Sequence, residues 1–555
     1  MNDSGCNVAR HLRTAAQTTP FAYATLTPLS VSNEGRVVHQ HRSFKVLDQE
    51  SDAAARIFYA DGIQKGTRTL LAVQPGHDLI VCMFALLKLG AVPIAIDPGM
   101  GWSKVLNCIQ HTQPTALVAM RPIALLSRLP FKAFKSFSSR VAIGGSNWRK
   151  LLVDCTSATP LPIAEVTANT EAAILFTSGS TGAPKGVNYT HGMFDAQIKL
   201  IRQTFRIQPG EIDMAMLPVF ALFNPALGMT TVTPMMNPSR PIEADPAPIV
   251  SAIRAEKVTN SFGSPAIWGR IAEYCLRENI KLPSLQRLLI AGAPVPNGLL
   301  EDLRTIAPNC EIHTPYGATE CLPATTIEST EILKETAAAT LLGQGTCVGR
   351  PVSGVQIKII QEVNGTIANL SDASECAPNT IGEIIVTGPS VTHSYDQLPI
   401  ATARAKIHDG EKIWHRMGDL GRIDAVGRLW FHGRCIEKVQ TVHGIITTES
   451  IEPAFRNHED VQRCALIGTG TTPKQIPILV IEPKPESFPG NEGERETFIK
   501  NLRIHARHNA LTHQIQKIVF QESLPVDVRH NAKIHRLKLA EEWTRRLSPK
   551  ISLKL

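Results

Sequence analysis

Two hydrophobic periods alternate along the N-terminal half of the chain. Residues 79–97 carry apolar positions at helical spacing up to Gly90, followed by a short apolar run. Residues 282–296 contain an apolar run at 288–290 that leads into a turn rich in glycine and proline. Helix-period stretches that alternate with short buried strands are typical of a parallel sheet covered by helices. The pattern therefore predicts an α/β fold with doubly wound α/β subdomains.

The pattern changes after about Gly349. Short apolar runs separated by turn signals, VQIKII, IGEIIVTG and GDLGRIDAVGRLWFHGR, predict an antiparallel, β-barrel-like region that completes a large domain. From about Cys435 onward the pattern is that of a smaller α+β unit, long enough to fold alone. We expect a large nucleotide- and substrate-binding domain at residues 1–433 and a smaller, mobile C-terminal domain at residues 434–555.

Composition and charge narrow the class of protein. The chain is 43% hydrophobic and 19% charged, as in ordinary folded proteins. Its net charge of +8 would suit nucleic acid, but Lys and Arg are spread along the chain without an aromatic-interleaved basic stripe, so we expect no nucleic-acid partner. A Lys/Arg excess after Ile499 leaves docking to an acidic partner or a membrane surface open at that end.

Cysteine usage and hydropathy indicate the compartment. The eleven cysteines are an odd number without a CxxC pair, which predicts reduced thiols and neither a disulfide nor a zinc framework. The first residues lack an apolar core behind a basic end, and there is no apolar run of about 18 residues. We therefore expect a cytoplasmic chain with no transmembrane segment.

A glycine- and hydroxyl-rich loop, TSGSTGAPKG, follows the apolar run at 172–176. Backbone N–H groups and hydroxyls of such a loop can wrap a polyphosphate, with Lys185 as a positive point charge. A Walker A loop needs Gly before the Lys and Ser or Thr after it, whereas Pro184 and Gly186 stand there, and no GxG opens the run. A flexible linker would explain the glycines and serines but not the PKG ending. The candidate phosphate-binding residues are Thr177, Ser178, Gly179, Ser180, Thr181, Gly182 and Lys185.

The residues behind this loop predict its place in the fold. Apolar side chains from Met193 to Phe205 recur at helical spacing. We therefore expect the loop to lie between a strand and a helix, where ligands bind in open α/β sheets.

Five further segments occur in order along the chain: AGAP at 291–294, YGATE at 316–320, GEIIVTGPSVTHSYD at 382–396, MGDLGRIDAVGRLWFHGR at 417–434 and HNAKIHR at 530–536. Together with the glycine-rich loop, they resemble the motifs of the adenylate-forming enzymes, which include acyl-CoA synthetases, luciferases and nonribosomal adenylation domains. The resemblance implies an enzyme that binds ATP and Mg²⁺. In this chemistry a carboxylate attacks the α-phosphorus of ATP and pyrophosphate leaves.

The resemblance also implies roles for individual residues. Lys533 is expected to contact the carboxylate and an α-phosphate oxygen, Thr319 to offer its hydroxyl to that phosphate, and Glu320 to hold Mg²⁺. Asp419 and Arg434 are expected on the ribose hydroxyls. Ordinary alternatives stay open, because Asp419 fits a turn and Lys533 a solvated surface position. The residues expected around the adenine are Gly292, Ala293, Pro294, Tyr316 and Gly317.

Several positions depart from the pattern of the CoA-using members. At the expected hinge, Ile436 takes the place of Asp, Gln440 that of Lys or Asn, and Gly444 is displaced by one residue. Ala221 stands where a His is usual, and Thr314 where an Asn is common. The LPVDVRHNAK segment is two residues longer than usual before its lysine. The departures at the hinge, at Ala221 and in the lysine segment put transfer of the acyl group to CoA in doubt, and Thr314 does the same for the contact with the adenine N6.

With these departures, PVFALFNPALG, YGATECLPATTIES and PVDVRHNAKIHR resemble a specific branch, the β-lactone synthetases of bacterial head-to-head long-chain olefin biosynthesis. This implies a long-chain 2-alkyl-3-hydroxyalkanoic acid as substrate, whose own 3-hydroxyl displaces AMP to close the lactone. It also implies assembly with the other pathway enzymes, a thiolase, a reductase and a β-lactone decarboxylase.

Some assignments stay open within this interpretation. Residues 219–229 are either a wall for an alkyl chain or ordinary core, and the group that takes the hydroxyl proton is unassigned, with His191 and His313 near the motifs in sequence. A long-chain fatty acyl-CoA synthetase shares the fold and the first step, and product formation that depends on CoA would distinguish it. A non-catalytic member of the same fold is a further alternative.

Overall fold

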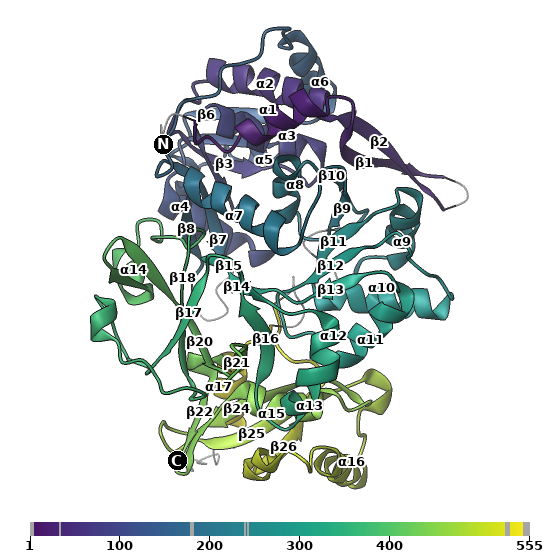
Figure 1. The fold of residues 1–555 in the computed structure, drawn as a ribbon, viewed down its shortest axis with the longest axis vertical. Helices are drawn as coiled ribbons and strands as arrows, with labels where there is room; N and C mark the ends of the chain where they lie inside the picture. Colours follow the sequence, from purple (N-terminus) through teal and green to yellow (C-terminus); the bar gives the residue numbers. More distant parts are fainter. Residues whose placement is uncertain are drawn as a thin grey trace, which may run out of the picture.

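The structure is a computed structural model that describes residues 5–32, 35–177, 183–237, 240, 243–527 and 533–547. Figure 1 shows the N-terminal half, in purple and blue, above an antiparallel sheet in green, with the C-terminal region at the lower end. A six-stranded sheet of order β6-β5-β3-β4-β7-β8 forms the first layer. Its strands are β3 (Arg68–Ala72), β4 (Val92–Ala95), β5 (Ala116–Met120), β6 (Ser139–Ile143), β7 (Glu171–Thr177) and β8 (Lys185–Thr190).

A second sheet of seven strands follows the order β13-β12-β11-β9-β10-β1-β2. All its neighbours pair in parallel except β1 with β2, which form an antiparallel hairpin that projects from the body (Figure 1). The strands are β1 (Tyr23–Val31), β2 (Val37–Ser43), β9 (Ile212–Ala215), β10 (Thr230–Val232), β11 (Asn260–Gly263), β12 (Arg287–Ile290) and β13 (Glu311–His313).

Helices connect and cover these two sheets, as expected for doubly wound subdomains. Side-chain caps fix where two of them begin, because Ser43 Oγ accepts from the Val46 N–H and Thr190 Oγ1 accepts from the Met193 N–H. The helices are α1 (Arg10–Thr18), α2 (Phe44–Ala60), α3 (His77–Lys88), α4 (Trp102–Thr112), α5 (Arg121–Leu126), α6 (Gly145–Asp154), α7 (His191–Thr204), α8 (Asn224–Leu227), α9 (Pro246–Ala255), α10 (Pro265–Arg277) and α11 (Asn297–Ile306).

The predicted passage from the glycine-rich loop directly into a helix is wrong. Strand β8 intervenes, pairing antiparallel with β7 through Ile174 and Asn188, and α7 begins only after it. Val187 and Tyr189 are buried while Asn188 between them is partly exposed, so this short stretch has the period of a strand. The loop therefore connects two paired strands; its residues 178–182 lie outside the described residues.

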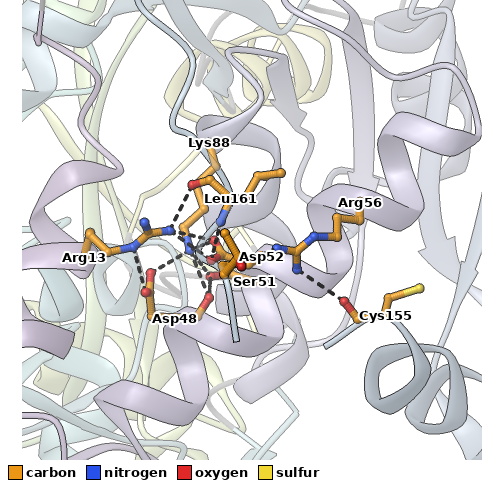
Figure 2. Close-up of polar contacts among 9 residues, drawn as sticks. Arg13, Asp48, Ser51, Asp52, Arg56, Lys88, Cys155 and Leu161 are labelled. Carbon is orange, nitrogen blue, oxygen red and sulfur yellow. Dashed lines mark hydrogen bonds and ion pairs between the residues drawn. The ribbon is translucent and has the colours of Figure 1, made fainter. Parts of the chain in front are cut away.

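A buried ionic cluster ties the first three helices together (Figure 2). Lys88 at the end of α3 is fully buried, and its Nζ lies 2.6 Å from Asp48 Oδ1 and 2.5 Å from Asp52 Oδ1, both on α2. Ser51 Oγ accepts from the same ammonium at 2.8 Å, and Arg13 of α1 pairs with Asp48 at 2.7 Å. Burial lowers the pKa of Lys88, and the carboxylates of Asp48 and Asp52 oppose that shift. Each charged side chain of the cluster is thus paired with an opposite charge that the protein itself supplies.

The predicted antiparallel region is an eight-stranded sheet of order β14-β15-β16-β21-β20-β18-β17, with β19 paired to β20. Its strands are β14 (Tyr316–Ala318), β15 (Cys321–Thr326), β16 (Thr346–Pro351), β17 (Gln356–Ile360), β18 (Gly382–Thr387), β19 (Lys406–Asp409), β20 (Lys412–Ile423) and β21 (Leu429–Arg434). The helices within this region are α12 (Ser329–Glu331), α13 (Ala337–Leu341) and α14 (Pro399–Ala405).

The chain after β21 forms a separate α+β region with its own hydrophobic clusters. A two-stranded sheet, β22 (Val439–Thr441) and β23 (Gly444–Ile446), precedes a three-stranded one of β24 (Val461–Thr469), β25 (Ile476–Pro483) and β26 (Lys517–Phe520). Its helices are α15 (Thr448–Arg456), α16 (Glu492–His505) and α17 (Arg536–Leu547). The predicted α/β class with a smaller C-terminal α+β part is confirmed.

Two further expectations concern cysteines and membranes. All eleven cysteines are free thiols, in agreement with the sequence. Across the described ranges, none of the helices is both long and apolar enough to cross a bilayer.

Candidate active site

A cavity of about 2080 Å³ lies where the two N-terminal sheets, the antiparallel sheet and the C-terminal region meet. Ala215, Phe262 and Ile290, at the carboxyl ends of the parallel strands β9, β11 and β12, line it. That edge is the position at which open α/β sheets bind ligands. The fold therefore places the cavity where the sequence motifs require a site.

A tyrosine, an aspartate and an arginine form one polar wall of the cavity. Asp419 of β20 faces Arg434 at the end of β21 in strand register, and Arg434 Nη1 donates to Asp419 Oδ1 at 2.7 Å. Tyr316 Oη, from β14, donates to Asp419 Oδ2 at 2.6 Å. Burial raises the pKa of Asp419, while the charges of Arg434 and Lys533 act in the opposite direction. Tyr316, Asp419 and Arg434 line the cavity, and so does Lys533. Asp419 is therefore more than a turn residue.

A backbone turn between β14 and β15 carries Thr319 and Glu320 to the same cavity. Tyr395 Oη donates to Glu320 Oε1 at 2.6 Å, and the Thr392 N–H donates to the Glu320 carbonyl at 2.9 Å. Tyr189 Oη donates to the carbonyl of Thr319. Burial and the neighbouring Glu320 raise the pKa of Tyr395, which keeps its phenol a donor. The carboxylate of Glu320 is thereby held in one orientation at the cavity wall.

The donor set at Glu320 is compatible with Mg²⁺. Carboxylate oxygens are ligands that this ion prefers, and it is commonly held by one or two carboxylates together with substrate phosphates. Within the part of the chain that the structure describes, there is no group of three or more His, Cys, Asp or Glu side chains arranged to hold a metal ion. Glu320 would therefore need phosphate oxygens to complete a magnesium site.

Lys533 reaches the cavity from the C-terminal region. The Asp527 N–H donates to its carbonyl at 2.8 Å, and Val526 forms a bridge with Ile534 just beyond it. Arg536 then anchors the start of α17 through an ion pair of 2.7 Å with the buried Glu452 of α15. These contacts hold the backbone from Lys533 to Arg536, and the exposed side chain of Lys533 lines the cavity. Asn531 and Ala532, the added residues before it, lie outside the described residues.

The turn after β12 and the start of β14 supply the expected adenine-side positions. Gly292, Ala293 and Pro294 line the cavity, and Gly292 has a φ of +96°, which favours glycine. Tyr316 and Gly317 line it too, and a Cβ on Gly317 would lie 2.4 Å from the Cys321 carbonyl oxygen. Glycine is therefore the residue that this close approach of the two strands allows.

Only part of the glycine-rich loop belongs to the described residues. Thr177 ends β7, and residues 178–182, which include Ser178, Gly179, Ser180, Thr181 and Gly182, lie outside the described residues. Lys185 is not among the cavity-lining residues; its Nζ lies 4.7 Å from the ring centroid of Tyr395, whose hydroxyl binds Glu320. The phosphate-binding role of this loop stays a prediction.

The candidate alkyl-chain wall divides into two parts. Residues 219–223, which include a short 3-10 helix, η3 (Phe220–Phe223), line the cavity, and Ala221 is among them. The rest turns inward: Asn224 donates to Asp213 Oδ2 at 2.8 Å, and Leu227 and Met229 are buried in the core. The interpretation as ordinary core is thus confirmed for the second part, whereas an alkyl-chain wall at residues 219–223 stays a prediction.

The structure does not bring His191 or His313 to the cavity wall. His191 Nδ1 accepts from the Val8 N–H, and burial lowers the pKa of His191 to about 4. His313 lies 3.4 Å from Glu311 and packs edge-on against Phe205. Neither imidazole can take the hydroxyl proton from this position.

Sequence reasoning missed three polar side chains at the site. Tyr395 is the last residue but one of the GEIIVTGPSVTHSYD motif, so its place in that motif was the available signal. Tyr189 and Gln197 both line the cavity, and Gln197 Nε2 donates to the Leu322 carbonyl at 2.7 Å. Tyr189 lies in β8 and Gln197 in α7, and neither belongs to a recognisable motif. No sequence signal therefore marked them.

Comparison with known proteins decides the family. A family model described as AMP-binding enzyme matches residues 13–396. The chain belongs to the AMP-binding enzyme family. The olefin β-lactone synthetase of Xanthomonas campestris pv. campestris is 39% identical to this AMP-binding enzyme, over 92% of this chain and 94% of that protein. The protein of the same name from Stenotrophomonas maltophilia is 40% identical, over 86% of this chain and 88% of its own length. The predicted resemblance is confirmed.

Solved structures agree on the fold. The anthranilate CoA ligase AuaEII, in complex with anthranoyl-AMP, superposes on this AMP-binding enzyme with a TM-score of 0.79 at 18% identity, covering 97% of each chain. The amide bond synthetase McbA from Marinactinospora thermotolerans gives a TM-score of 0.76 at 20% identity, covering 97% of this chain and 99% of its own. At such identities the likeness establishes the architecture alone.

Proposed function

We propose that this AMP-binding enzyme adenylates a long-chain 2-alkyl-3-hydroxy acid and closes it to a β-lactone, with release of AMP and pyrophosphate. The observation that carries the proposal is the continuity of one cavity. It joins the polar wall of Asp419 and Arg434 to apolar walls of the kind that alkyl chains require. The two relatives named olefin β-lactone synthetase, similar along almost the whole chain, support the same reaction.

In the first step a carboxylate oxygen of the substrate attacks the α-phosphorus of ATP, and the bond to pyrophosphate breaks. Asp419 accepts hydrogen bonds from the ribose hydroxyls, with Arg434 and Tyr316 holding its carboxylate in place. Lys533 offers its ammonium to the α-phosphate oxygens, where negative charge builds up. The Thr319 hydroxyl donates to the same phosphate, while residues 177–182 and Lys185 surround the β- and γ-phosphates.

Mg²⁺ would be held by Glu320 together with phosphate oxygens, and it would neutralise charge on the departing pyrophosphate. Tyr395 serves that role by donating to Glu320 Oε1, which leaves the carboxylate pointed at the cavity. The protein's own contribution is therefore a carboxylate whose direction is set before the nucleotide arrives.

In the second step the oxygen of the substrate's 3-hydroxyl attacks the acyl carbon, AMP leaves, and the hydroxyl proton is released. The nucleophile and the electrophile belong to one molecule, so the cavity has only to hold a reactive conformation. Attack on the adenylate by an external thiol, that of CoA, has less support than attack by the substrate's own hydroxyl. The position at which CoA-using members carry a His is Ala221 at the cavity wall, and Ile436 at the expected hinge is 50% exposed.

The apolar lining comes from two separate parts of the fold, which suits a substrate with two alkyl chains. One group lies between the six-stranded sheet and its helices, with Met83, Ile109 and Phe134 among its members. The other surrounds η3 and the end of β11, with Phe220 and Phe262 stacked at 3.7 Å between ring centroids. A cytoplasmic location and assembly with the thiolase, reductase and decarboxylase of an olefin pathway complete the proposal.

A long-chain acyl-CoA ligase is the alternative function. A putative acyl-CoA ligase of Bacillus subtilis, YdaB, is 24% identical over 82% of this chain, well below the two synthetases. NMR of the extracted product separates the two functions. Purified protein with Mg-ATP and a 2-alkyl-3-hydroxy acid should release a β-lactone without CoA, and the acid that lacks its 3-hydroxyl should stop at the adenylate. A product that forms only with CoA, as a thioester, would contradict the lactone reaction.

A further inference from the structure

The apolar part of the cavity reaches the surface around α4, α5 and η2 (Lys132–Phe134). Trp102 and Ile123 line the cavity and are nevertheless 48% and 39% exposed. Deeper in the same part, Ile109 and Leu117 line it and are buried. The apolar wall thus continues from the interior onto the outer surface, and the cavity has an open end there.

Further large apolar side chains are exposed beside this opening. Together with Trp102 and Ile123 they form a surface that we call the apolar rim, and they are Leu125, Leu126, Leu129 and Phe131. Solvent-exposed apolar clusters of this kind mark interaction sites in folded proteins.

Backbone hydrogen bonds and contacts between aromatic rings order the residues of the apolar rim. The Arg128 and Leu129 N–H groups donate to the carbonyls of Leu125 and Leu126 at 3.1 Å, which continues α5 as a tight turn. Phe134 makes edge contacts with both Phe131 and Trp102, at 5.6 and 6.3 Å between ring centroids. These contacts hold the exposed rings and aliphatic side chains in fixed positions around the opening.

The segment that carries the rim holds charges of one sign, and the acidic residues that flank it in sequence are Asp97, which caps η1 (Pro98–Met100) at the cavity wall, and Asp154. Residues 98–153 contain no Asp or Glu, although the chain has 49 acidic residues in all. Five cations within this stretch lie on or near the rim and are exposed: Lys104, Arg121, Arg128, Lys132 and Lys135. A surface that lies in the headgroup layer of an anionic membrane typically combines large apolar side chains with cations and lacks carboxylates.

We propose that the apolar rim docks on the anionic face of a lipid bilayer, with its large side chains in the headgroup layer and the five cations on lipid phosphates. The open end of the cavity then faces the lipid. A protein partner seated on the rim would close the opening, whereas a bilayer extends the apolar phase that the cavity begins.

Docking of this kind gives a long-chain amphiphile a route between the bilayer and the cavity that does not cross water. The identity of that amphiphile rests on the proposed function, but the docking itself does not. Binding to vesicles is measured without ATP, so its failure and the failure of lactone formation are separate results.

Flotation of the full-length protein with vesicles tests the proposal. Vesicles of phosphatidylcholine containing phosphatidylglycerol should bind the protein at least about tenfold more tightly than vesicles of phosphatidylcholine alone, and added salt should reduce the difference. The triple variant Arg128→Gln/Lys132→Gln/Lys135→Gln should lose most of this preference. The double variant Leu125→Gln/Leu129→Gln should weaken binding even at low salt, because it removes the apolar part.

A second basic surface supplies the matched control. The variant Arg495→Gln/Lys500→Gln/Arg507→Gln removes three cations from or next to α16, where Glu492, Glu494 and Glu496 interrupt the positive charge. It should float like the unchanged protein. All variants should keep the thermal midpoint and, with detergent-dispersed substrate, the adenylation rate, since none of the substituted residues lines the cavity. Equal binding to both kinds of vesicle, no binding, or the same loss in the α16 variant would overturn the proposal.

Discussion

Two buried groups of charges in this molecule use the same kinds of side chain and serve different ends. Around Lys88, two aspartates and a serine accept hydrogen bonds from the ammonium, Arg13 pairs with the same two aspartates, and the cluster joins α1, α2 and α3 (Figure 2). Around Asp419, Arg434 and Tyr316 satisfy the carboxylate, but all three line the cavity. The first group is closed, whereas the second has one side open to a ligand.

The difference shows what separates a structural ion cluster from a binding site. A buried charge is tolerated when paired and hydrogen-bonded, and both groups meet that condition. Neither Arg13 Nε nor Arg434 Nε makes a hydrogen bond in the described chain, but Arg13 Nε lies 2.7 Å from Asp48 Oδ2, whereas Arg434 Nε is buried at the wall of the cavity. The open group therefore keeps unused hydrogen-bonding capacity beside the cavity, which a ligand can employ. Variants of the two groups should accordingly affect stability in one case and nucleotide binding in the other.

The largest effect is expected from Lys88→Met. Removal of the ammonium leaves Asp48 and Asp52 with Arg13 as their cationic partner among the described residues. Loss of one member of a buried ion pair typically costs about 3–5 kcal/mol of unfolding free energy. Urea unfolding should show this loss, and ATP affinity measured under folding conditions should not change. Lys65→Met is the matched control, because Lys65 is exposed and donates to the backbone carbonyl of Glu165. Equal stability of the two variants would show that the closed cluster is not structural.

Lys533→Ala should have the next largest effect, on rate alone. Lys533 acts on charge that develops in the transition state, and removal of one such donor typically slows the step by about 100- to 1000-fold. ATP affinity should stay near that of the unchanged protein, since the ribose and adenine contacts remain. Pyrophosphate exchange measures the first step. Lys538→Ala, on the exposed side of α17, is the control, and unchanged exchange in Lys533→Ala would remove this lysine from the mechanism.

Asp419→Ala should weaken ATP binding by roughly 10- to 100-fold, because a hydrogen bond to a charged group contributes about 1.5–3 kcal/mol. The ribose contact is made equally in the ground and transition states, so the maximal rate should fall much less than the affinity. Titration calorimetry with ATP provides the measurement. An affinity equal to that of the unchanged protein would contradict the assigned role.

Tyr316→Phe should have the smallest effect of the four. It removes the hydrogen bond to Asp419 and keeps the ring, which lies 5.8 Å from the ring of Phe431 between centroids. Loss of this orienting contact should weaken ATP binding by about threefold to tenfold. The same titration reports it. A larger loss than in Asp419→Ala would mean that the tyrosine ring, and not the carboxylate, dominates nucleotide binding.

Local patterns were sufficient to predict much of the fold. The helix-period stretch before Gly90 is α3, the apolar run at 288–290 lies in β12, and the change of pattern after Gly349 precedes the strands from β17 to β21. These features follow from periodicity and turn residues, which act over short distances along the chain. Strand β8 was missed because its few residues sit between a glycine-rich loop and a strong helical pattern. The domain boundary between residues 433 and 434 stays a prediction.

The candidate site was predictable where a motif carries the residue and not where the contact is made in three dimensions. Asp419, Arg434, Glu320 and Lys533 lie in motifs, and the structure brings all four to one cavity. The hydrogen bond from Tyr395 to Glu320 spans 75 residues of sequence, and Lys88 is 36 residues from Asp52. Pairings over such separations depend on strand order and helix packing, which the pattern of single segments does not specify.

The most direct test of the open site compares the affinity for ATP with that for 2′,3′-dideoxy-ATP in three proteins. The unchanged enzyme should prefer ATP by roughly 10- to 100-fold, because hydrogen bonds from the ribose hydroxyls to a charged acceptor are lost in the analogue. Asp419→Ala should bind both nucleotides about equally, and Lys88→Met should keep the preference of the unchanged enzyme. Retention of the full preference in Asp419→Ala, or its loss in Lys88→Met, would contradict the account.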